Sequence, residues 1–302
     1  MWFWFSLIAL VCWSGSDLFS KIGCQDADDK YSHLKMVMAV GLVMGLHAAY
    51  EIFIGGTAIN GSIILTYLPV SLLYISSMTI GYIGLRYIEL SISSPICNSS
   101  GALVAVLALA TGGLGELVPA QLAATALVCV GVIGLGIVEA REDDDLRAAR
   151  QQASNHRYAK SALALILPVI YCLLDALGTF ADSRVLETLD EDSANCAYEL
   201  TFLLAAIVCF VYVVLIKKSK LLPKREAPKY AGALCETAGQ FAYIYALADT
   251  EHVALAAPII SAYCVASVLW SRIFLKEKLS WKHYGMIALV VAGIVILGIY
   301  DA

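Results

Sequence analysis

Charged residues are scarce in this chain. They account for 15% of the 302 residues, whereas hydrophobic residues account for 60%, and the mean hydropathy is +0.77. A soluble domain of this length needs a larger charged fraction, because a polar surface must cover its core. The sequence also has no run of basic residues interleaved with aromatic ones. The composition therefore excludes an ordinary soluble domain and gives no reason to expect a nucleic-acid partner.

The short motifs of common catalytic and cofactor sites are missing as well. The sequence contains no HExxH, no GxSxG, no Walker loop and no dinucleotide-binding fingerprint. Its nine cysteines never occur as CxxC, and most lie in apolar runs, which is typical of small buried side chains rather than of a disulfide framework. We therefore expect no enzyme, no metal site and no cofactor, and the chain alone is not expected to pump with ATP.

The sequence contains long apolar runs instead of such motifs. Runs of about 18 residues or more are long enough to cross about 30 Å of hydrocarbon as a helix. The first run lacks the basic start and small-residue cleavage site of a signal peptide, so it is counted as a helix. The runs predict ten transmembrane helices, with spans near 2–22, 33–54, 62–84, 90–111, 119–138, 161–181, 195–216, 229–248, 252–274 and 282–300.

The basic residues indicate how these helices are oriented. With the N-terminus outside, every Lys and Arg except Arg184 falls in a cytoplasmic loop or its flank. The positive-inside rule therefore supports both ten spans and an extracytoplasmic position for the two termini. We expect an integral, multi-pass protein, and the short loops favour a bacterial plasma membrane.

The two halves of the chain also resemble each other. The motif LSISSPI aligns with VALAAPI and pairs Pro95 with Pro258, while WSGSD aligns with YCLLD and pairs Asp17 with Asp175. Five helices are an odd number, so the second unit must enter the membrane from the opposite side. This predicts an inverted-topology repeat, which is common among secondary carriers. The predicted units are a first five-helix repeat (1–138), a charged cytoplasmic linker (139–160) and a second five-helix repeat (161–302).

The same motifs carry a family resemblance over essentially the whole chain. WSGSDLFSK, GYIGLRYIELSISSPI, the Gly115-Glu116 pair before LVPAQ, and KEKLSWKHYGMIALVVAGIVIL resemble the drug/metabolite transporter superfamily, within its EamA branch of ten-helix carriers. The resemblance implies an all-α polytopic membrane fold in which helices one, three, four, six, eight and nine surround a central cavity. Ten-helix relatives are generally drawn with both termini in the cytoplasm. The charge count places them outside, and we follow the charge count.

Three acidic residues lie well inside predicted helices: Asp17, Asp175 and Glu236. An ionisable side chain at the centre of a bilayer costs about 2.5–3.5 kcal/mol on insertion scales, so each needs a reason. For Glu236 the alternative to a role in transport is a hydrogen bond to a neighbouring helix. No Lys or Arg lies equally deep, although Lys21 is one turn from Asp17 and is able to pair with it. A negative site favours a cationic or zwitterionic solute, or protons that bind to the carboxylates.

Aromatic and polar residues on the same helices complete the predicted site. Trp13 and Tyr171 lie one turn before the acidic residues of helices one and six, and aromatic faces beside carboxylates suit an ammonium group. Asn98 and Ser261 each follow a repeat proline, where a kink exposes polar backbone. We expect Asp17, Asp175 and Glu236 to bind the protons if transport is coupled to them. The predicted substrate-binding residues are Trp13, Asp17, Tyr82, Asn98, Tyr171, Asp175, Glu236, Tyr243, Ser261 and Tyr263.

Structural roles are expected for other polar residues. Glu51 and Glu199 are placed at the membrane interface, with His47 one turn before Glu51 and able to pair with it. Glu116 and Glu277 begin the turns after helices four and nine, where they are expected to cap or brace the next helix. Small residues allow close helix contact inside the monomer. The glycine pairs expected to do so are Gly41/Gly45, Gly81/Gly84 and Gly131/Gly134.

These patterns favour a secondary transporter that works by alternating access. The expected solute is a small amine, an amino-acid-like metabolite or another cationic compound, with proton coupling as an option. Alternatives are a carrier of neutral or anionic metabolites whose carboxylates only couple protons, and a membrane-embedded enzyme or sensor. The enzyme needs a nucleophile or metal, and the sensor needs an output module. The expected partners are a small-molecule substrate and the lipid bilayer, and both a monomer and a homodimer stay open.

Overall fold

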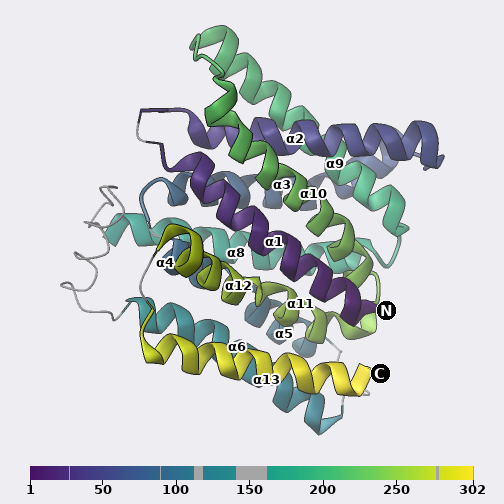
Figure 1. Cartoon of the computed structure of the whole chain (residues 1–302). Helices are drawn as coiled ribbons and strands as arrows, with labels where there is room; N and C mark the ends of the chain where they lie inside the picture. The colour runs from purple at the N-terminus through teal and green to yellow at the C-terminus, as the bar shows by residue number, and fades with distance from the viewer. Residues whose placement is uncertain (27, 89, 112–117, 141–161, 277–278, 302) are drawn as a thin grey trace.

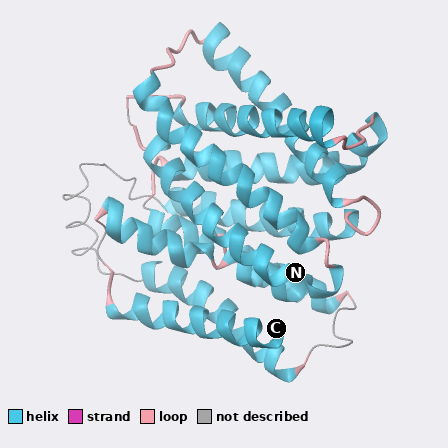
Figure 2. Ribbon diagram, turned by 45° about the vertical axis from the view of Figure 1, so that its right-hand side comes forward, coloured by secondary structure: helices cyan, strands magenta, loops and turns pink. Residues whose placement is uncertain are grey.

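In the computed structural model, all regular secondary structure of the described residues is helical (Figure 2). Most of the predicted linker, together with Glu116 and Glu277, lies outside these residues. The roles expected for them therefore stay predictions. The structure describes residues 1–26, 28–88, 90–111, 118–140, 162–276 and 279–301.

Nine helices of the described ranges are long and apolar enough to cross a membrane. The predicted all-α polytopic membrane fold is thereby confirmed. Another helix, α10 (Pro223–Leu247), has 25 residues but carries several charged side chains in its first two turns and Glu236 near its middle. Since α10 is not among the nine apolar helices, the count of ten crossings stays a prediction.

The long helices begin and end close to the predicted spans. Helix α9 (Glu191–Phe210) starts a few residues early, because the Asp190 side chain accepts a hydrogen bond from the Ser193 N–H and caps the helix. Pro223 starts α10 early, since its fixed φ suits a first helical turn. The other long elements are α1 (Trp2–Cys24), α2 (Ser32–Tyr50) with η1 (Glu51–Gly55), α3 (Gly61–Leu85), α6 (Pro119–Ala140), α8 (Ala162–Val185), η2 (Val211–Ile216) and α13 (Trp281–Asp301).

Two helices predicted to be continuous are broken near their middle. Residues 90–111 form α4 (Leu90–Cys97) and α5 (Ser100–Ala110), and residues 252–274 form mainly α11 (Val253–Ser261) and α12 (Tyr263–Trp270). Pro95 and Pro258 precede the two breaks by less than one turn. A proline lacks the backbone N–H that would bond the carbonyl four residues earlier, so each helix is weakened close to its break. Short elements flank the second pair, namely η3 (Thr250–His252) and η4 (Ser271–Leu275).

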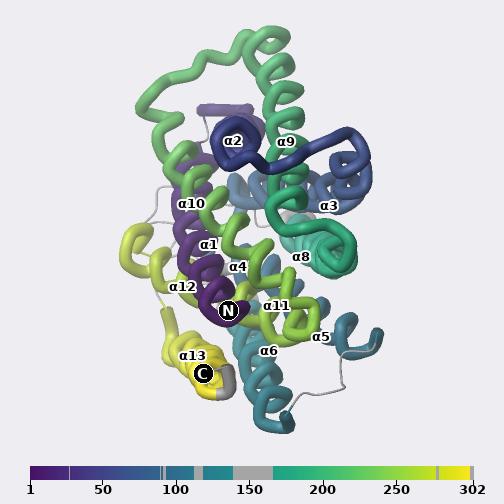
Figure 3. Tube along the Cα trace, turned by 90° about the vertical axis from the view of Figure 1, so that its right-hand side faces the viewer, coloured from purple at the N-terminus to yellow at the C-terminus, as the bar shows by residue number. Residues whose placement is uncertain are grey.

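The helices pack in pairs across the bundle. Viewed along the bundle, α2 and α9 lie on one side, α6 and α13 on the opposite side, and the remaining helices between them (Figure 3). Helix α1 packs on α10, and α8 packs on α3. If the second half repeats the first, α8 corresponds to α1 and α10 to α3, so these are two copies of one contact.

The directions of the helices agree with such a repeat. Helix α1 begins at the end of the bundle where the N-terminus is marked, whereas α8 begins at the opposite end (Figure 1). The end of α13 lies beside the start of α1, as expected for termini on the same side of a membrane (Figure 1). The packing pairs and the opposed directions support the inverted repeat, which stays a prediction together with its boundaries.

Glycines bring several of these helices into backbone contact. A Cβ on Gly41 of α2 would lie 2.2 Å from the carbonyl oxygen of Phe202 on α9. A Cβ on Gly101 would lie 2.7 Å from the carbonyl oxygen of Ala257, where α5 crosses α11. Gly45, Gly81, Gly131 and Gly134 likewise face other helices of the same chain. The glycine contacts expected from the sequence are therefore made inside the monomer.

Gly41→Ala is expected to destabilise the bundle, because the backbone of Phe202 cannot rotate away from a new methyl group. Overpacking of this kind costs about 1–3 kcal/mol, which outweighs the gain of about 1 kcal/mol in helix propensity. The matched control is Gly285→Ala in α13, where a Cβ meets nothing within 4 Å. Thermal unfolding of the purified variants should give a lower midpoint for Gly41→Ala only. Equal midpoints would show that the α2–α9 contact is not tight.

Candidate functional site

A cavity with about 70 Å³ of free space lies at the centre of the bundle. It is narrow in comparison with pockets for drug-sized ligands, which measure about 300–1,000 Å³. The six helices that the resemblance places around a cavity all line it, and α9 adds Tyr198. All ten predicted substrate-binding residues are among its walls: Trp13, Asp17, Tyr82, Asn98, Tyr171, Asp175, Glu236, Tyr243, Ser261 and Tyr263.

Each of the three acidic residues in this cavity is held by serine hydroxyls of another helix. Ser267 donates to Oδ2 of Asp17 at 2.7 Å, and Ser94 donates to the same oxygen. The other two bonds run from Ser100 to Asp175 Oδ2 (2.7 Å) and from Ser16 to Glu236 Oε2 (2.6 Å). Within the described residues, the second oxygen of each carboxylate accepts no hydrogen bond from a side chain. Each carboxylate is therefore positioned by one oxygen and has the other available.

These serine bonds tie the acidic residues to the broken helices. Ser94 lies just before the break between α4 and α5, and Ser100 is the first residue of α5. Ser267 lies on α12, so Asp17 connects both broken segments to α1. The two acidic residues of the predicted repeat therefore accept hydrogen bonds from hydroxyls of the broken segments.

The alternative pairing of Asp17 with Lys21 does not occur among the described residues. The ammonium group of Lys21 donates instead to the carbonyl oxygens of Leu85 and Ile88, at 2.8 Å each. These carbonyls belong to the last turn of α3 and the segment that follows, which lack partners inside the helix. Lys21 thus closes the end of α3, while serines hold Asp17.

Aromatic rings form much of the remaining wall. Six tyrosines and one tryptophan line the cavity. The ring of Trp13 lies 5.0 Å from that of Tyr243 and 5.8 Å from that of Tyr263, measured between centroids. No Lys, Arg or His belongs to the lining residues that the structure describes. Three carboxylates among aromatic faces, without a cation in the wall, make the cavity attractive to a positive group.

Several lining residues were not predicted from the sequence. They include the serine donors Ser16 and Ser94, the tyrosine–threonine pair Tyr74 and Thr179, and Gln240. Thr179 follows Asp175 by four residues, so helical spacing alone would have placed it on the same face. The serines give no such signal, because serine is common at helix contacts and its partner on another helix is set by tertiary packing.

The surroundings of Glu199 do not follow from the sequence. Its side chain is fully buried where α9 packs on α2, whereas its expected position at the membrane interface stays a prediction. Its Oε1 lies 2.9 Å from Nδ1 of His47, whereas Nε2 of His47 lies 3.7 Å from Glu51 Oε1. The expected pairing of His47 with Glu51 is thus present but is the longer of the two. None of these three residues lines the cavity.

A buried ion cluster closes the bundle at the end where α1 finishes. The ammonium group of Lys35 lies 2.9 Å from Asp29 and 3.5 Å from Glu226, and that of Lys229 lies 3.1 Å from Glu226. All four side chains are at most 10% exposed. The cluster joins α2 and α10 to the loop after α1, so any opening at this end must separate these charges.

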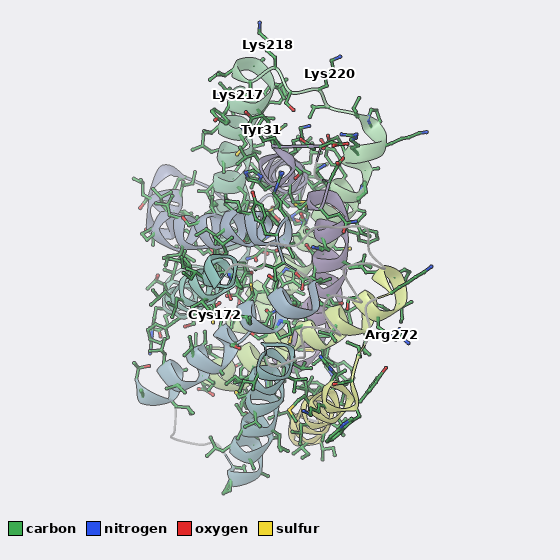
Figure 4. The ribbon with its side chains drawn as sticks, turned by 90° about the vertical axis from the view of Figure 1, so that its left-hand side faces the viewer. Tyr31, Cys172, Lys217, Lys218, Lys220 and Arg272 are labelled. Carbon is green, nitrogen blue, oxygen red and sulfur yellow. The ribbon has the colours of Figure 1, made fainter. Side chains whose placement is uncertain are left out.

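The outer surface at the same end is basic. Figure 4, which looks onto this end, shows the side chains of Lys217, Lys218, Lys220 and Arg272 projecting from it. Arg184 lies in the last turn of α8, at the opposite end, where it donates to Glu187 and Thr111. The two ends therefore differ in charge as the sequence predicts, whereas the side of the membrane on which each lies stays a prediction.

Comparison with known proteins identifies the type of molecule. Residues 162–299 match the model of the EamA-like transporter family. The chain belongs to the drug/metabolite transporter superfamily. It is a multi-pass integral membrane protein and a transporter of this type, and members of the EamA family are transporters rather than enzymes. The matched region coincides with the second predicted repeat of this drug/metabolite transporter.

The other comparisons concern the fold alone. A solved structure titled only "Crystal structure of protein" aligns with 98% of this chain and 96% of its own, at a TM-score of 0.63 and 13% sequence identity. That likeness shows the same fold and carries no information on substrate. No curated protein matches this drug/metabolite transporter.

Asp17→Ala should lower the thermal midpoint of this transporter more than Asp17→Asn. The alanine variant leaves the hydroxyls of Ser94 and Ser267 without their acceptor at the junction of the broken helices. A buried polar group that loses its partner costs about 1–3 kcal/mol. Asparagine keeps one acceptor oxygen and nearly the same volume. Thermal unfolding in detergent measures the difference, and identical midpoints would mean that these hydrogen bonds do not stabilise the breaks.

Proposed function

We propose that this transporter carries small zwitterionic or cationic amines, such as amino-acid-like metabolites, in exchange for protons and by alternating access. The observation that carries the proposal is the charge of the cavity. Asp17, Asp175 and Glu236 line one space, each with a carboxylate oxygen that accepts no side-chain hydrogen bond. Because no basic side chain lines that space, a positive group of the substrate is the natural partner.

The aromatic wall favours an ammonium group over a metal ion as that partner. A metal ion prefers several oxygen or nitrogen ligands at close range, and the described residues contain no cluster of His, Cys, Asp and Glu able to hold one. An ammonium or alkylammonium group gains from aromatic faces as well as from carboxylates. Trp13, whose ring contacts those of Tyr243 and Tyr263, lies one turn before Asp17, and the three rings provide such faces.

Unpaired donors in the same wall favour a zwitterion over a simple amine. The hydroxyls of Ser20 and Tyr82 and Nε2 of Gln240 are buried and have no hydrogen-bond partner within the described residues. All three residues line the cavity. Buried polar groups are normally paired, so a ligand with an acceptor group, such as a carboxylate or carbonyl, would complete them. An amino-acid-like molecule carries both the cation and the acceptor.

The narrow cavity fits a carrier that must rearrange to admit its substrate. The space of about 70 Å³ lies where the broken segments α4–α5 and α11–α12 meet. Broken helices at the centre of an inverted repeat are a recurrent form of carrier binding site. Opening toward one side would separate the ion cluster of Lys35, Asp29, Glu226 and Lys229. Protons on the carboxylates would balance their charge while the site is empty.

Ligand binding to the purified protein tests this proposal. Amines, amino acids, nucleosides and sugars are compared by the rise in thermal midpoint, since a ligand that binds the folded state raises it. Each amino acid is paired with its N-acetyl form, which lacks the positive charge, and with its amide, which lacks the negative charge. We expect the amino acids to stabilise most, the amides less, and the N-acetyl forms not at all.

The variant Asp175→Asn should fold normally and lose both this stabilisation and transport in vesicles. Glu187→Gln is the matched control, because it removes an exposed carboxylate that is not part of the cavity. Equal stabilisation of the native protein and Asp175→Asn by neutral solutes would reject the proposed substrate class. It would leave the transporter assignment intact and support the alternative in which the carboxylates only couple protons.

A further inference from the structure

A fourth buried carboxylate lies outside the cavity and has no part in the site described above. Asp182 of α8 is fully buried, and Tyr67 of α3 donates a hydrogen bond of 2.7 Å to its Oδ1. Its Oδ2 is buried without a hydrogen-bond partner in the described part of the chain. Tyr67 belongs to a cluster of tyrosines on α3, α9 and α10. In this cluster Tyr198 packs on Tyr67 and Tyr74, and Tyr74 packs on Tyr243.

No Lys, Arg or His among the described residues forms an ion pair with Asp182. A charge buried without a partner is costly, and a carboxyl group avoids that cost by holding a proton. Arg184, two residues later on the same helix, is half exposed and pairs with Glu187. The surroundings of Asp182 therefore favour a protonated carboxyl group over a carboxylate in an ion pair.

Hydroxyls of this tyrosine cluster reach the cavity. Tyr74 forms a short hydrogen bond with Tyr243 and donates to Thr179 at 3.0 Å. Tyr74, Thr179 and Tyr243 line the cavity, whereas Asp182 does not. Thr179 lies one turn after Asp175 on α8, so these hydroxyls reach the neighbourhood of Asp175.

The donors among these hydroxyls run in one direction. Tyr74 has one hydroxyl hydrogen and gives it to Thr179, so Tyr243 must be the donor in the bond between the two tyrosines. Tyr243 then has only lone pairs to offer to Asp182. A protonated Asp182 supplies the matching donor, and its unpartnered Oδ2 is an oxygen that can carry this hydrogen.

We propose that Asp182 passes protons into the cavity through Tyr243, Tyr74 and Thr179, so that it serves as the proton-loading group for Asp175. This inference rests on the proposed proton exchange. The proton of Asp182 moves to the Tyr243 oxygen while Tyr243, Tyr74 and Thr179 each pass on their own hydroxyl proton. The last one binds to the carboxylate of Asp175, directly or through a water molecule. Each hydroxyl keeps one proton, and Asp182 becomes a carboxylate that takes up a new proton before the next cycle.

Infrared spectroscopy of the full-length protein tests the proposal without any substrate. The carbonyl band of a protonated carboxyl group is followed from about pH 4 to about pH 9, which covers the range in which such groups titrate in proteins. Asp182→Asn should remove one pH-dependent band. Tyr67→Phe should shift that same band, because the carboxyl group loses a hydrogen bond. If Asp182→Asn removes no pH-dependent band, the proposal is wrong.

The relay itself is tested by kinetics. After a rapid drop in pH, the band that Asp175→Asn removes reports protonation of Asp175. Asp182→Asn and Tyr74→Phe should each abolish its fast phase. Tyr198→Phe is the matched control, because Tyr198 packs against the rings of Tyr67 and Tyr74 but its hydroxyl points to the sulfur of Met78.

Each outcome of the kinetic test either supports or contradicts the relay. Loss of the fast phase in Tyr74→Phe but not in Tyr198→Phe supports the relay. An unchanged rate in Tyr74→Phe would show that Asp175 takes its proton from cavity water. Equal slowing in Tyr74→Phe and Tyr198→Phe would show an effect of packing. Either result contradicts the relay. If Asp182→Asn does not fold, Tyr74→Phe carries the test with the carboxyl group in place. Failure of the ligand screen leaves these measurements unaffected, so the two proposals fail separately.

Discussion

The hydrogen bonds between cavity carboxylates and serines at the broken helices are the interaction on which the centre of the bundle depends. A break in a membrane helix leaves backbone groups without partners, and a buried carboxylate needs donors. In this transporter serine side chains at the breaks supply donors to the carboxylates. Asp17 accepts from Ser94 and Ser267, and Asp175 accepts from Ser100. The segment α4–α5 is therefore bonded to α1 and α8, and α11–α12 is bonded to α1. The close approach at Gly101, where α5 crosses α11, completes this arrangement.

The sequence predicts the parts of the molecule that follow from membrane physics. Apolar length places the helices to within a few residues, and the cost of burying ionisable groups identifies Asp17, Asp175 and Glu236 as lining residues. It does not predict contacts that depend on which helix faces which. The partner of Glu199 is an example, because the pairing with His47 follows only from the packing of α2 on α9. The serine donors were missed for the same reason, because only the packed bundle brings them to the carboxylates.

The prolines show the limit of prediction in one element. Pro95 and Pro258 predict a kink, and the structure contains a full break at both places. Whether a helix bends or breaks depends on whether neighbouring groups can satisfy the backbone that is freed. Here the side chain of Ser99 donates to the carbonyl of Pro95, in the last turn of α4. Such partners become visible only once the chain has turned.

A cavity that satisfied all of its carboxylates would be a poor carrier site, because nothing in it would change when substrate enters. In this transporter serines pair with one oxygen of each carboxylate and leave the other to protons or to a positive group of the substrate. On the proposed mechanism these two ligands compete for the same oxygens, so binding of one lowers the affinity for the other, and that reciprocity is what couples their movements. A proton-loading group at Asp182 would add direction, since it supplies protons from one end of the bundle. The hydroxyl relay would then couple the two fluxes without requiring bulk water inside the narrow cavity.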